Sequence, residues 1–212
     1  MIPKIVSYLD FLFPNPRCEL NYHKDYELLL AVMMSAQTTD KRVNMVTEIL
    51  FTEYPSLEAL ASAKEEDIIN IIRPIGTYQR KASNIISISK SLLEHTDGHV
   101  PNDRVYLESL SGIGHKTANV VLSNLYGENC MAVDTHVSRV SKRLGLAQSS
   151  DDVSVIEKKL TKKFKGYSLS RLHHQFVLFG RYHCKSMSPN CLECQLQEFC
   201  KEYQKKNKKK EK

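Results

Sequence analysis

The chain has 212 residues and a mass of 24.3 kDa, enough for one large domain or two small ones. Hydrophobic residues make up 42 % of it, which excludes a disordered chain. Its net charge is +6, but residues 201–212 alone carry seven lysines and two glutamates, so the remaining 200 residues carry only +1. The body therefore cannot bind nucleic acid by bulk charge, and any such binding must depend on local geometry.

The first 34 residues bear on where the protein resides. Met1–Pro14 contains Lys4 and Asp10 within its apolar stretch and has no small-residue cleavage site, which argues against a secretory signal. The longest apolar run, Leu28–Met34, has seven residues, whereas a membrane span needs about 20. We therefore expect a cytosolic protein with no targeting signal. Its six cysteines are then reduced or metal-bound rather than paired.

The apolar residues between the scattered glycines and prolines follow helical spacing. Such stripes run through residues 67–75, where Pro74 is expected to end the helix, and through residues 85–93 and 153–164. Leu28–Met34 is apolar on every side, which indicates a fully buried helix. Because no segment alternates apolar and polar residues over strand length, the sequence predicts an all-α protein of nine or ten short helices.

A glycine turn is expected between two predicted helices, Asp103–Leu110 and Lys116–Tyr126. Gly112 and Gly114 allow backbone to approach a bulky ligand, and the following helix N-terminus offers unpaired N–H groups to an anion. The pattern predicts a phosphate contact, which would carry no information about base sequence. An ordinary tight turn without a ligand is the alternative.

Two charged side chains follow this turn. Lys116 lies in the first helical turn, where the helix N-terminus and any burial would favour a neutral, nucleophilic amine. The alternative is a surface lysine that contacts phosphate. Asp134 precedes another helical stripe and is expected to cap that helix. The same capped carboxylate could face a developing cation.

Four cysteines near the end of the chain follow the pattern C-x6-C-x2-C-x5-C: Cys184, Cys191, Cys194 and Cys200. Four thiolates suit either structural zinc or a cubane iron–sulfur cluster. Only one C-x2-C pair is present, so the spacing favours iron–sulfur, with disulfides the weakest reading. The cluster is expected to fold its segment rather than to do redox catalysis. Cys18 and Cys130 are expected to be small buried apolar residues.

Taken together, these segments resemble the endonuclease III family of DNA glycosylases, in the helix-hairpin-helix superfamily. The resemblance rests on three motifs: L-S-G-I-G-H-K-T-A-N-V-V-L from Leu110, V-D-T-H-V from Val133, and the four-cysteine pattern. The segment S-A-Q-T-T-D from Ser35 adds to it, and the match extends from about Glu19 to Cys200.

The resemblance implies two helical domains flanking a DNA-binding cleft. A six-helix barrel domain would span residues 18–130, with its helix-hairpin-helix at about 103–126. The other domain would combine residues 1–17 with 131–200 and hold a 4Fe–4S cluster on the four cysteines. Residues 201–212 would form a Lys-rich flexible tail.

The chemistry implied is base excision repair of oxidised pyrimidines, such as thymine glycol, in duplex DNA. Lys116 would attack C1′ of the damaged nucleoside and form a Schiff base, and β-elimination would then cut the strand 3′ to the abasic site. Asp134 would assist departure of the base. Because C1′ cannot be reached inside the base stack, the nucleotide must be flipped out.

Further residues take roles by resemblance. A glutamine matching Gln37 fills the gap left by the flipped nucleotide, and a residue matching Thr77 wedges the stack. Other DNA contacts are implied at Gly112, Ile113, Gly114, His136 and Lys185. A monovalent cation is implied on the main-chain carbonyls of Glu108, Leu110 and Ile113.

Two positions and one loop depart from the family pattern. Thr77 stands where relatives often have leucine, so it would bury less apolar surface against the bases. Ser111 stands where proline is common, which loses some conformational restriction of the turn. Residues 185–190 contain one basic residue where relatives often have several, and the Lys-rich tail would offset this.

Alternatives to a bifunctional glycosylase/lyase are a monofunctional mismatch glycosylase, a non-catalytic helix-hairpin-helix DNA-binding module and an electron-transfer protein. Mismatch glycosylases lack a lysine at the position of Lys116, and a simple DNA grip has no need of Asp134. The resemblance implies a monomer that is cytoplasmic and nucleoid-associated, with no membrane partner.

Overall fold

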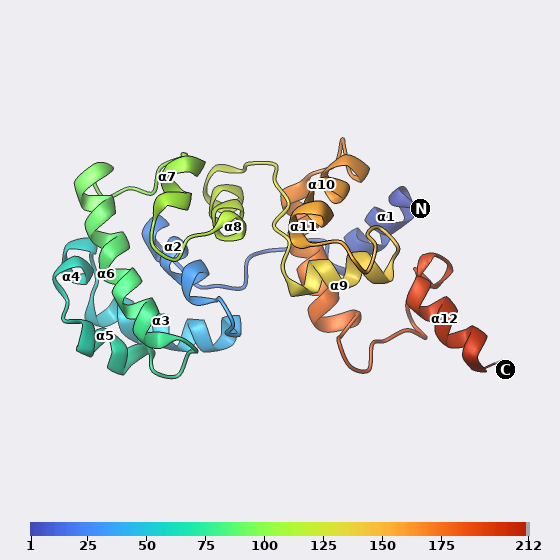
Figure 1. Cartoon of the computed structure of the whole chain (residues 1–212), viewed down its shortest axis with the longest axis horizontal. Helices are drawn as coiled ribbons and strands as arrows, with labels where there is room; N and C mark the ends of the chain where they lie inside the picture. Colours follow the sequence, from blue (N-terminus) through green and yellow to red (C-terminus); the bar gives the residue numbers. More distant parts are fainter. Residues whose placement is uncertain (211–212) are drawn as a thin grey trace. The chain divides into compact units, whose positions relative to one another are not determined.

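The computed structural model of the chain describes residues 1–210, and the side chains of residues 1–205. Every regular element in the described range is helical: twelve α-helices, one π-helical turn and one short 3-10 helix (Figure 1). The prediction of an all-α protein is confirmed, although nine or ten helices were expected.

The chain divides into two compact units. Unit 1 comprises Met1–Cys18 and Gly127–Lys212, and unit 2 comprises Glu19–Tyr126. Sequence analysis places the two junctions at residues 17–18 and 130–131. The first helix of the chain therefore packs with the C-terminal half rather than with the helices that follow it.

Unit 2 consists of seven helices, where a six-helix barrel was expected. The helices are α2 (Asp25–Met34), α3 (Asp40–Glu53), α4 (Leu57–Ser62), α5 (Glu65–Ile72), α6 (Tyr78–His95), α7 (Arg104–Ser109) and α8 (His115–Tyr126). Helix α2 packs against α3, α6 and α8. Every residue of Leu28–Met34 is at most 3 % exposed, which confirms the prediction of a buried helix.

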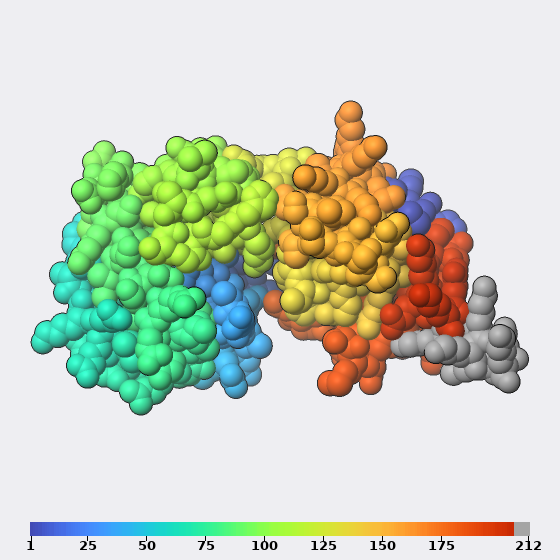
Figure 2. Space-filling model, viewed as in Figure 1, coloured from blue at the N-terminus to red at the C-terminus, as the bar shows by residue number. Residues whose placement is uncertain are grey.

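The stripe predicted over residues 85–93 lies on α6, where Ile85, Ile88 and Leu92 are fully buried. Full burial of one such side chain stabilises the fold by about 1.5–3 kcal/mol. Helix α5 ends at Ile72, two residues before the proline expected to end it. In the space-filling view, α6, α7 and α8, in green, make much of the displayed surface of unit 2 (Figure 2).

Unit 1 contains five α-helices within its described residues: α1 (Ile2–Leu12), α9 (Thr135–Arg143), α10 (Val153–Lys163), α11 (Leu169–Leu178) and α12 (Lys201–Lys210). A π-helical turn, Phe179–His183, extends α11, and a 3-10 helix spans Gln197–Phe199. The core includes Phe164 and Phe176, whose rings meet edge to face with centroids 5.7 Å apart. Helix α11 contacts both α1 and α9 and so joins the two segments of the unit.

Lys201–Lys210 is helical, although a flexible tail was expected. Helix α12 begins against α9, where the Glu202 carboxylate lies 3.7 Å from Arg143 Nε and the Lys201 side chain covers Gly145. The backbone amide of Gln204 donates to the Cys200 carbonyl, which fixes the first turn of the helix. These anchors explain the helix despite its run of lysines. The last two residues of the expected tail lie outside the described residues.

Cys18 and Cys130 are half-buried, so the prediction that they are buried apolar residues is wrong. Both also take part in polar interactions. All six cysteines are free thiols in the structure. No helix within residues 1–210 is long and apolar enough to cross a membrane.

Candidate active site and cluster site

The predicted glycine turn is present between α7 and α8. Leu110 and Ile113 are buried, and the Ile113 amide donates to the Leu110 carbonyl at 3.0 Å, which closes the turn. Gly112 and Gly114 are exposed, and Gly112 has a φ of 80°, a left-handed conformation that favours glycine. The turn therefore anchors itself through two apolar side chains and presents bare backbone to solvent. The buried Ile113 side chain leaves only its main chain for contact with a ligand.

Lys116 is the second residue of α8 and its side chain is half-buried. Among the described residues, its amine has no hydrogen-bond or ion-pair partner. Residues 118–123, just after it, are buried against the rest of unit 2. The helix is therefore fixed by its core face, and the amine is left available directly behind the exposed turn.

Four polar side chains beside the turn form a network that sequence reasoning missed. Arg104 Nη1 donates to Asn119 Oδ1 at 2.5 Å, and His115 Nδ1 lies 3.0 Å from Glu108 Oε1. Asn119 Nδ2 and His115 Nε2 are 3.3 Å apart, and Arg104 lies 3.7 Å from Glu108. The network ties α7 to α8 across the turn. Its contacting residues are four to fifteen positions apart, so only the helix pairing reveals it.

Asp134 lies in unit 1, as the N-cap of α9. Its Oδ1 accepts the Val137 amide at 2.8 Å, so the predicted capping role is present. The preceding segment, residues 131–133, is buried, and the His173 ring nitrogen Nδ1 is 2.8 Å from the Ala132 carbonyl oxygen. The Val137 amide thus fixes the carboxylate through one oxygen, the His173 contact fixes the backbone before it, and the cap does not use the second oxygen.

His136 is half-buried in the first turn of α9, and its Nδ1 lies 3.2 Å from Arg139 Nη2. The same guanidinium nitrogen donates to the Gly180 carbonyl at 2.6 Å. A Cβ on Gly180 would lie 2.8 Å from the Cβ of His136, so the π-helical turn packs directly on this histidine. His136 is therefore held by unit 1 itself.

Gln37 and Thr77 share an unusual backbone conformation. Both are exposed and both are left-handed, with φ of 57° and 55°. This region costs a residue other than glycine of order 1–3 kcal/mol, and it is least tolerated by β-branched residues such as threonine. A Cβ on Gly76 would lie 3.7 Å from the Gln37 carbonyl oxygen, so the two turns adjoin. Strained backbone of this kind concentrates at functional sites.

The four cysteines of the predicted cluster line one pocket in unit 1, together with Leu144, Phe179 and His183. All four are half-buried. Burial, with some contribution from the neighbouring thiols, raises the pKa of Cys194 to about 11 and also raises the pKa of Cys200. The thiols of Cys194 and Cys200 therefore lose a proton less readily than a free cysteine unless a cation lies beside them.

Two hydrogen-bond donors approach the sulfur atoms. Arg143 Nη1 lies 3.4 Å from Cys184 Sγ, and the Tyr203 amide lies 3.5 Å from Cys200 Sγ. Arg143 also donates to the carbonyls of Lys185, at 2.6 Å, and Ser186, at 3.1 Å. Across residues 1–205, no three His, Cys, Asp or Glu side chains converge on a single metal ion. Four cysteines that line one pocket are the set of ligands that either structural zinc or an iron–sulfur cluster takes.

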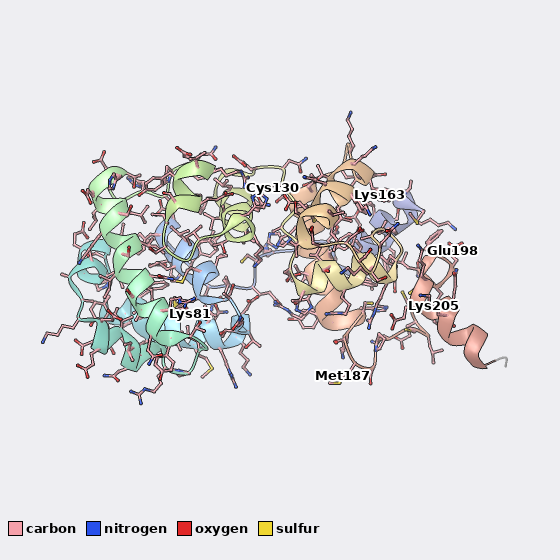
Figure 3. The ribbon with its side chains drawn as sticks, in the orientation of Figure 1. Lys81, Cys130, Lys163, Met187, Glu198 and Lys205 are labelled. Atoms are coloured by element: carbon pink, nitrogen blue, oxygen red, sulfur yellow. The ribbon has the colours of Figure 1, made fainter. Side chains whose placement is uncertain are left out.

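The loop after Cys184 is exposed. Lys185 is exposed, and Met187 and Leu192 are 84 % and 89 % exposed. Figure 3 shows Met187 at the tip of this loop, pointing away from the body of unit 1. The Arg143 contacts hold the base of the loop at Lys185 and Ser186, Met187 lies at its tip, and Leu192 is exposed just after Cys191.

Comparisons with known proteins bear directly on this site. Residues 30–166 match the HhH-GPD family, which is described as "HhH-GPD superfamily base excision DNA repair protein". The class is thus a helix-hairpin-helix base excision repair protein. Endonuclease III of Bacillus subtilis is 46 % identical over 198 residues, which cover 93 % of this chain and 90 % of that protein. Endonuclease III of Escherichia coli K12 is 41 % identical over 193 residues, covering 91 % and 90 %.

A solved structure of a trapped covalent endonuclease III–DNA intermediate, in its estranged-adenine complex, is 43 % identical to this chain. It aligns with a TM-score of 0.93 and covers 97 % of both chains. The chain belongs to the endonuclease III family. The resemblance inferred from the motifs is therefore confirmed, while the roles of the individual residues stay predictions.

Proposed function

We propose that this protein is a bifunctional DNA glycosylase and AP lyase that removes oxidised pyrimidines from duplex DNA and cuts the strand 3′ to the abasic site. The observation that carries this proposal is the Lys116 amine. It is half-buried, has no partner among the described residues, and lies two residues after Gly114 of the exposed glycine turn. A nucleophile needs this combination of access and freedom from competing hydrogen bonds.

The exposed backbone of the turn at Gly112 and Gly114 binds a DNA phosphate, assisted by the N-terminus of α8. This contact is independent of base sequence, as repair of scattered lesions requires. The carbonyls of Glu108, Leu110 and Ile113 would hold a monovalent cation, which would add positive charge beside the phosphate contact. The phosphate contact places C1′ of the flipped nucleoside near Lys116.

In the reaction, the lone pair of Lys116 Nζ attacks C1′, the amine gives up its proton, and the bond from C1′ to the base nitrogen breaks, so that the base departs with the bonding electrons and takes up a proton. The sugar ring opens to a Schiff base between C1′ and Nζ. Loss of a proton from C2′ then expels the 3′ phosphate oxygen, which is the β-elimination. Hydrolysis of the Schiff base returns free lysine.

Asp134 supports base departure. Its Oδ1 is held at 2.8 Å by the Val137 amide, which fixes the carboxylate without using its second oxygen. That oxygen stabilises cationic character at C1′ and takes part in proton transfer. Gln37 fills the gap that the flipped nucleotide leaves, and Thr77 wedges the base stack. His136 and Lys185 contribute further DNA contacts.

Cys184, Cys191, Cys194 and Cys200 hold a 4Fe–4S cluster. The pocket that they line and the donors from Arg143 and Tyr203 suit a group with several sulfur atoms, because such N–H groups stabilise cluster sulfur. When bound, the cluster supplies four metal–sulfur bonds that join the end of the π-helical turn to the start of α12. Its role is to fold the exposed loop of Lys185 and Met187.

The partner is duplex DNA that contains an oxidised pyrimidine or an abasic site. The protein acts as a monomer in the cytoplasm, associated with the nucleoid. Both statements extend the family membership of the chain.

The test is borohydride trapping on a duplex with one thymine glycol, with wild type, Lys116→Gln and the matched control Lys90→Gln. Lys90 is an exposed lysine of the same unit, on α6. A covalent protein–DNA band is expected from wild type and Lys90→Gln but not from Lys116→Gln. A band of equal strength from Lys116→Gln would remove Lys116 as nucleophile. Base release without any band would mean a water-activated glycosylase, and neither would mean a non-catalytic binder.

A further inference from the structure

Lys81 is a buried lysine that none of the roles above uses. It lies in the first turn of α6 and is 3 % exposed, which is rare for this residue type. Its Nζ donates to the Ala36 carbonyl at 2.8 Å and lies 3.4 Å from Thr38 Oγ1. Burial lowers the pKa of its amine. Figure 3 shows Lys81 between α6 and the segment that follows α2.

The two partners of Lys81 flank Gln37. The turn closes through the Thr38 amide, which donates to the Ser35 carbonyl at 3.1 Å, and Gln37 lies at its left-handed corner. Gln37 points to solvent while Lys81 holds the residues on either side of it from within. A strained corner persists only where its surroundings determine it, and the buried ammonium group is the charged contact that does so here.

The same lysine is tied to the second strained turn. Its own backbone amide donates to the Thr77 carbonyl at 3.1 Å, in the first turn of α6. Thr77 is the left-handed N-cap of that helix. Lys81 therefore contacts one turn through its side chain and the other through its main chain. The two turns also adjoin each other, because a Cβ on Gly76 would lie 3.7 Å from the Gln37 carbonyl oxygen.

We propose that Lys81 is a positioning residue that fixes the turns of Gln37 and Thr77 as one rigid unit, ready to enter the base stack. This inference rests on the proposed function. Lys81 does not touch the substrate, and it acts through the two turns. An apolar residue would fill the same buried volume without desolvating a charge, so the ammonium group is present for its hydrogen bonds.

The proposal makes a prediction about which substrates are affected. Replacing Lys81 by methionine keeps the apolar stem but leaves the Ala36 carbonyl without its donor, so the turn of Gln37 loses its fixed conformation. The loss matters only when a stacked base must be displaced. Steps on DNA that is already open should be unchanged.

The experiment compares Lys81→Met with Lys90→Met, an exposed lysine on the same helix. Single-turnover base release from a duplex with thymine glycol opposite adenine should fall by about tenfold in Lys81→Met, in keeping with loss of a hydrogen bond from a charged donor. β-Elimination on single-stranded abasic DNA should stay within about twofold of wild type. Lys90→Met should match wild type on both substrates.

Two further measurements test whether Lys81 acts on base release through the turn of Gln37. With the lesion opposite an abasic site, where flipping is cheap, the loss in Lys81→Met should shrink. In a Gln37→Ala background, the Lys81→Met change should add less than about threefold, because residues that act together are not additive. Should Lys81→Met not fold, Lys81→Gln keeps a shorter N–H donor and should show an intermediate loss with the same substrate dependence.

Equal losses on duplex and single-stranded DNA, or full additivity with Gln37→Ala, would overturn the proposal and make Lys81 a stabilising residue only. No loss on any substrate would also overturn it. Failure of wild type itself to release base or to be trapped would instead refute the proposed function. The two failures are therefore distinguishable.

Discussion

Two kinds of turn in unit 2 serve the proposed DNA contact in opposite ways. The turn of Gly112 and Gly114 places glycine at its left-handed position and rests on two buried apolar side chains, Leu110 and Ile113. The turns of Gln37 and Thr77 place side chains at left-handed positions and rest on the buried Lys81. In the turn proposed to present its backbone to DNA, glycine occupies the left-handed position without strain. In the turns proposed to insert a side chain, the backbone is strained and a buried polar contact supports it.

The largest expected effect comes from Gly112→Ala, with Gly114→Ala as its matched control. A Cβ on Gly112 would lie 2.2 Å from Asn84 Nδ2 and occupy a left-handed backbone, whereas a Cβ on Gly114 meets nothing within 4 Å. Gly112→Ala should lower the free energy of unfolding by about 1–3 kcal/mol, measured by urea denaturation. Gly114→Ala should leave it within about 0.5 kcal/mol.

The control also tests the role of the backbone. If phosphate approaches Gly114 closely, Gly114→Ala should weaken binding to duplex DNA although its stability is unchanged. Unchanged affinity in Gly114→Ala would mean that the turn is only a connection between α7 and α8. Equal stability of both variants would show that the left-handed position does not require glycine.

In the strained turns of Gln37 and Thr77, a change of side chain should raise the free energy of unfolding rather than lower it. Thr77→Gly and Gln37→Gly relieve a left-handed side chain, so each should raise the free energy of unfolding by about 0.5–1 kcal/mol, after the entropic cost of glycine. Each should also slow single-turnover base release from duplex DNA, by about tenfold for Gln37→Gly, because the inserted side chain is lost. Variants that are less stable, or that are more stable and fully active, would contradict the contrast between the two kinds of turn.

Local patterns account for what the sequence could predict. The helix at Leu28–Met34 follows from its unbroken apolar run, the cap at Asp134 from its place before a helical stripe, and the glycine turn from its spacing. Each depends on residues within one or two turns of each other. The same locality explains why the motif set identified the family from the chain alone.

Other features depend on long-range contacts or leave no sequence signal. A lysine at position 81 is typical of an exposed helix residue, and the hydrogen-bond partners of its amine lie 43 and 45 positions away in the sequence, so no local pattern reveals its burial. A left-handed Gln37 or Thr77 has no local marker, since neither is glycine or asparagine. The helix at Lys201–Lys210 reads as a tail because its anchor, Arg143, belongs to α9. Cys130 was expected in the core but is half-buried.

The smallest expected effect is a difference in the pH dependence of the free energy of unfolding, which depends on the buried amine of Lys81. Burial holds the pKa of Lys81 below the ordinary lysine value of 10.5, which the unfolded chain regains. Between the folded and the unfolded pKa the unfolded state binds more protons, so stability rises with pH. Wild type should therefore gain stability relative to Lys81→Met as the pH increases toward 10.5, whereas Lys90→Met should keep the wild-type slope. Parallel curves for wild type and Lys81→Met, from urea denaturation at several pH values, would mean that the pKa of Lys81 is the same in the folded and the unfolded chain and that burial does not lower it.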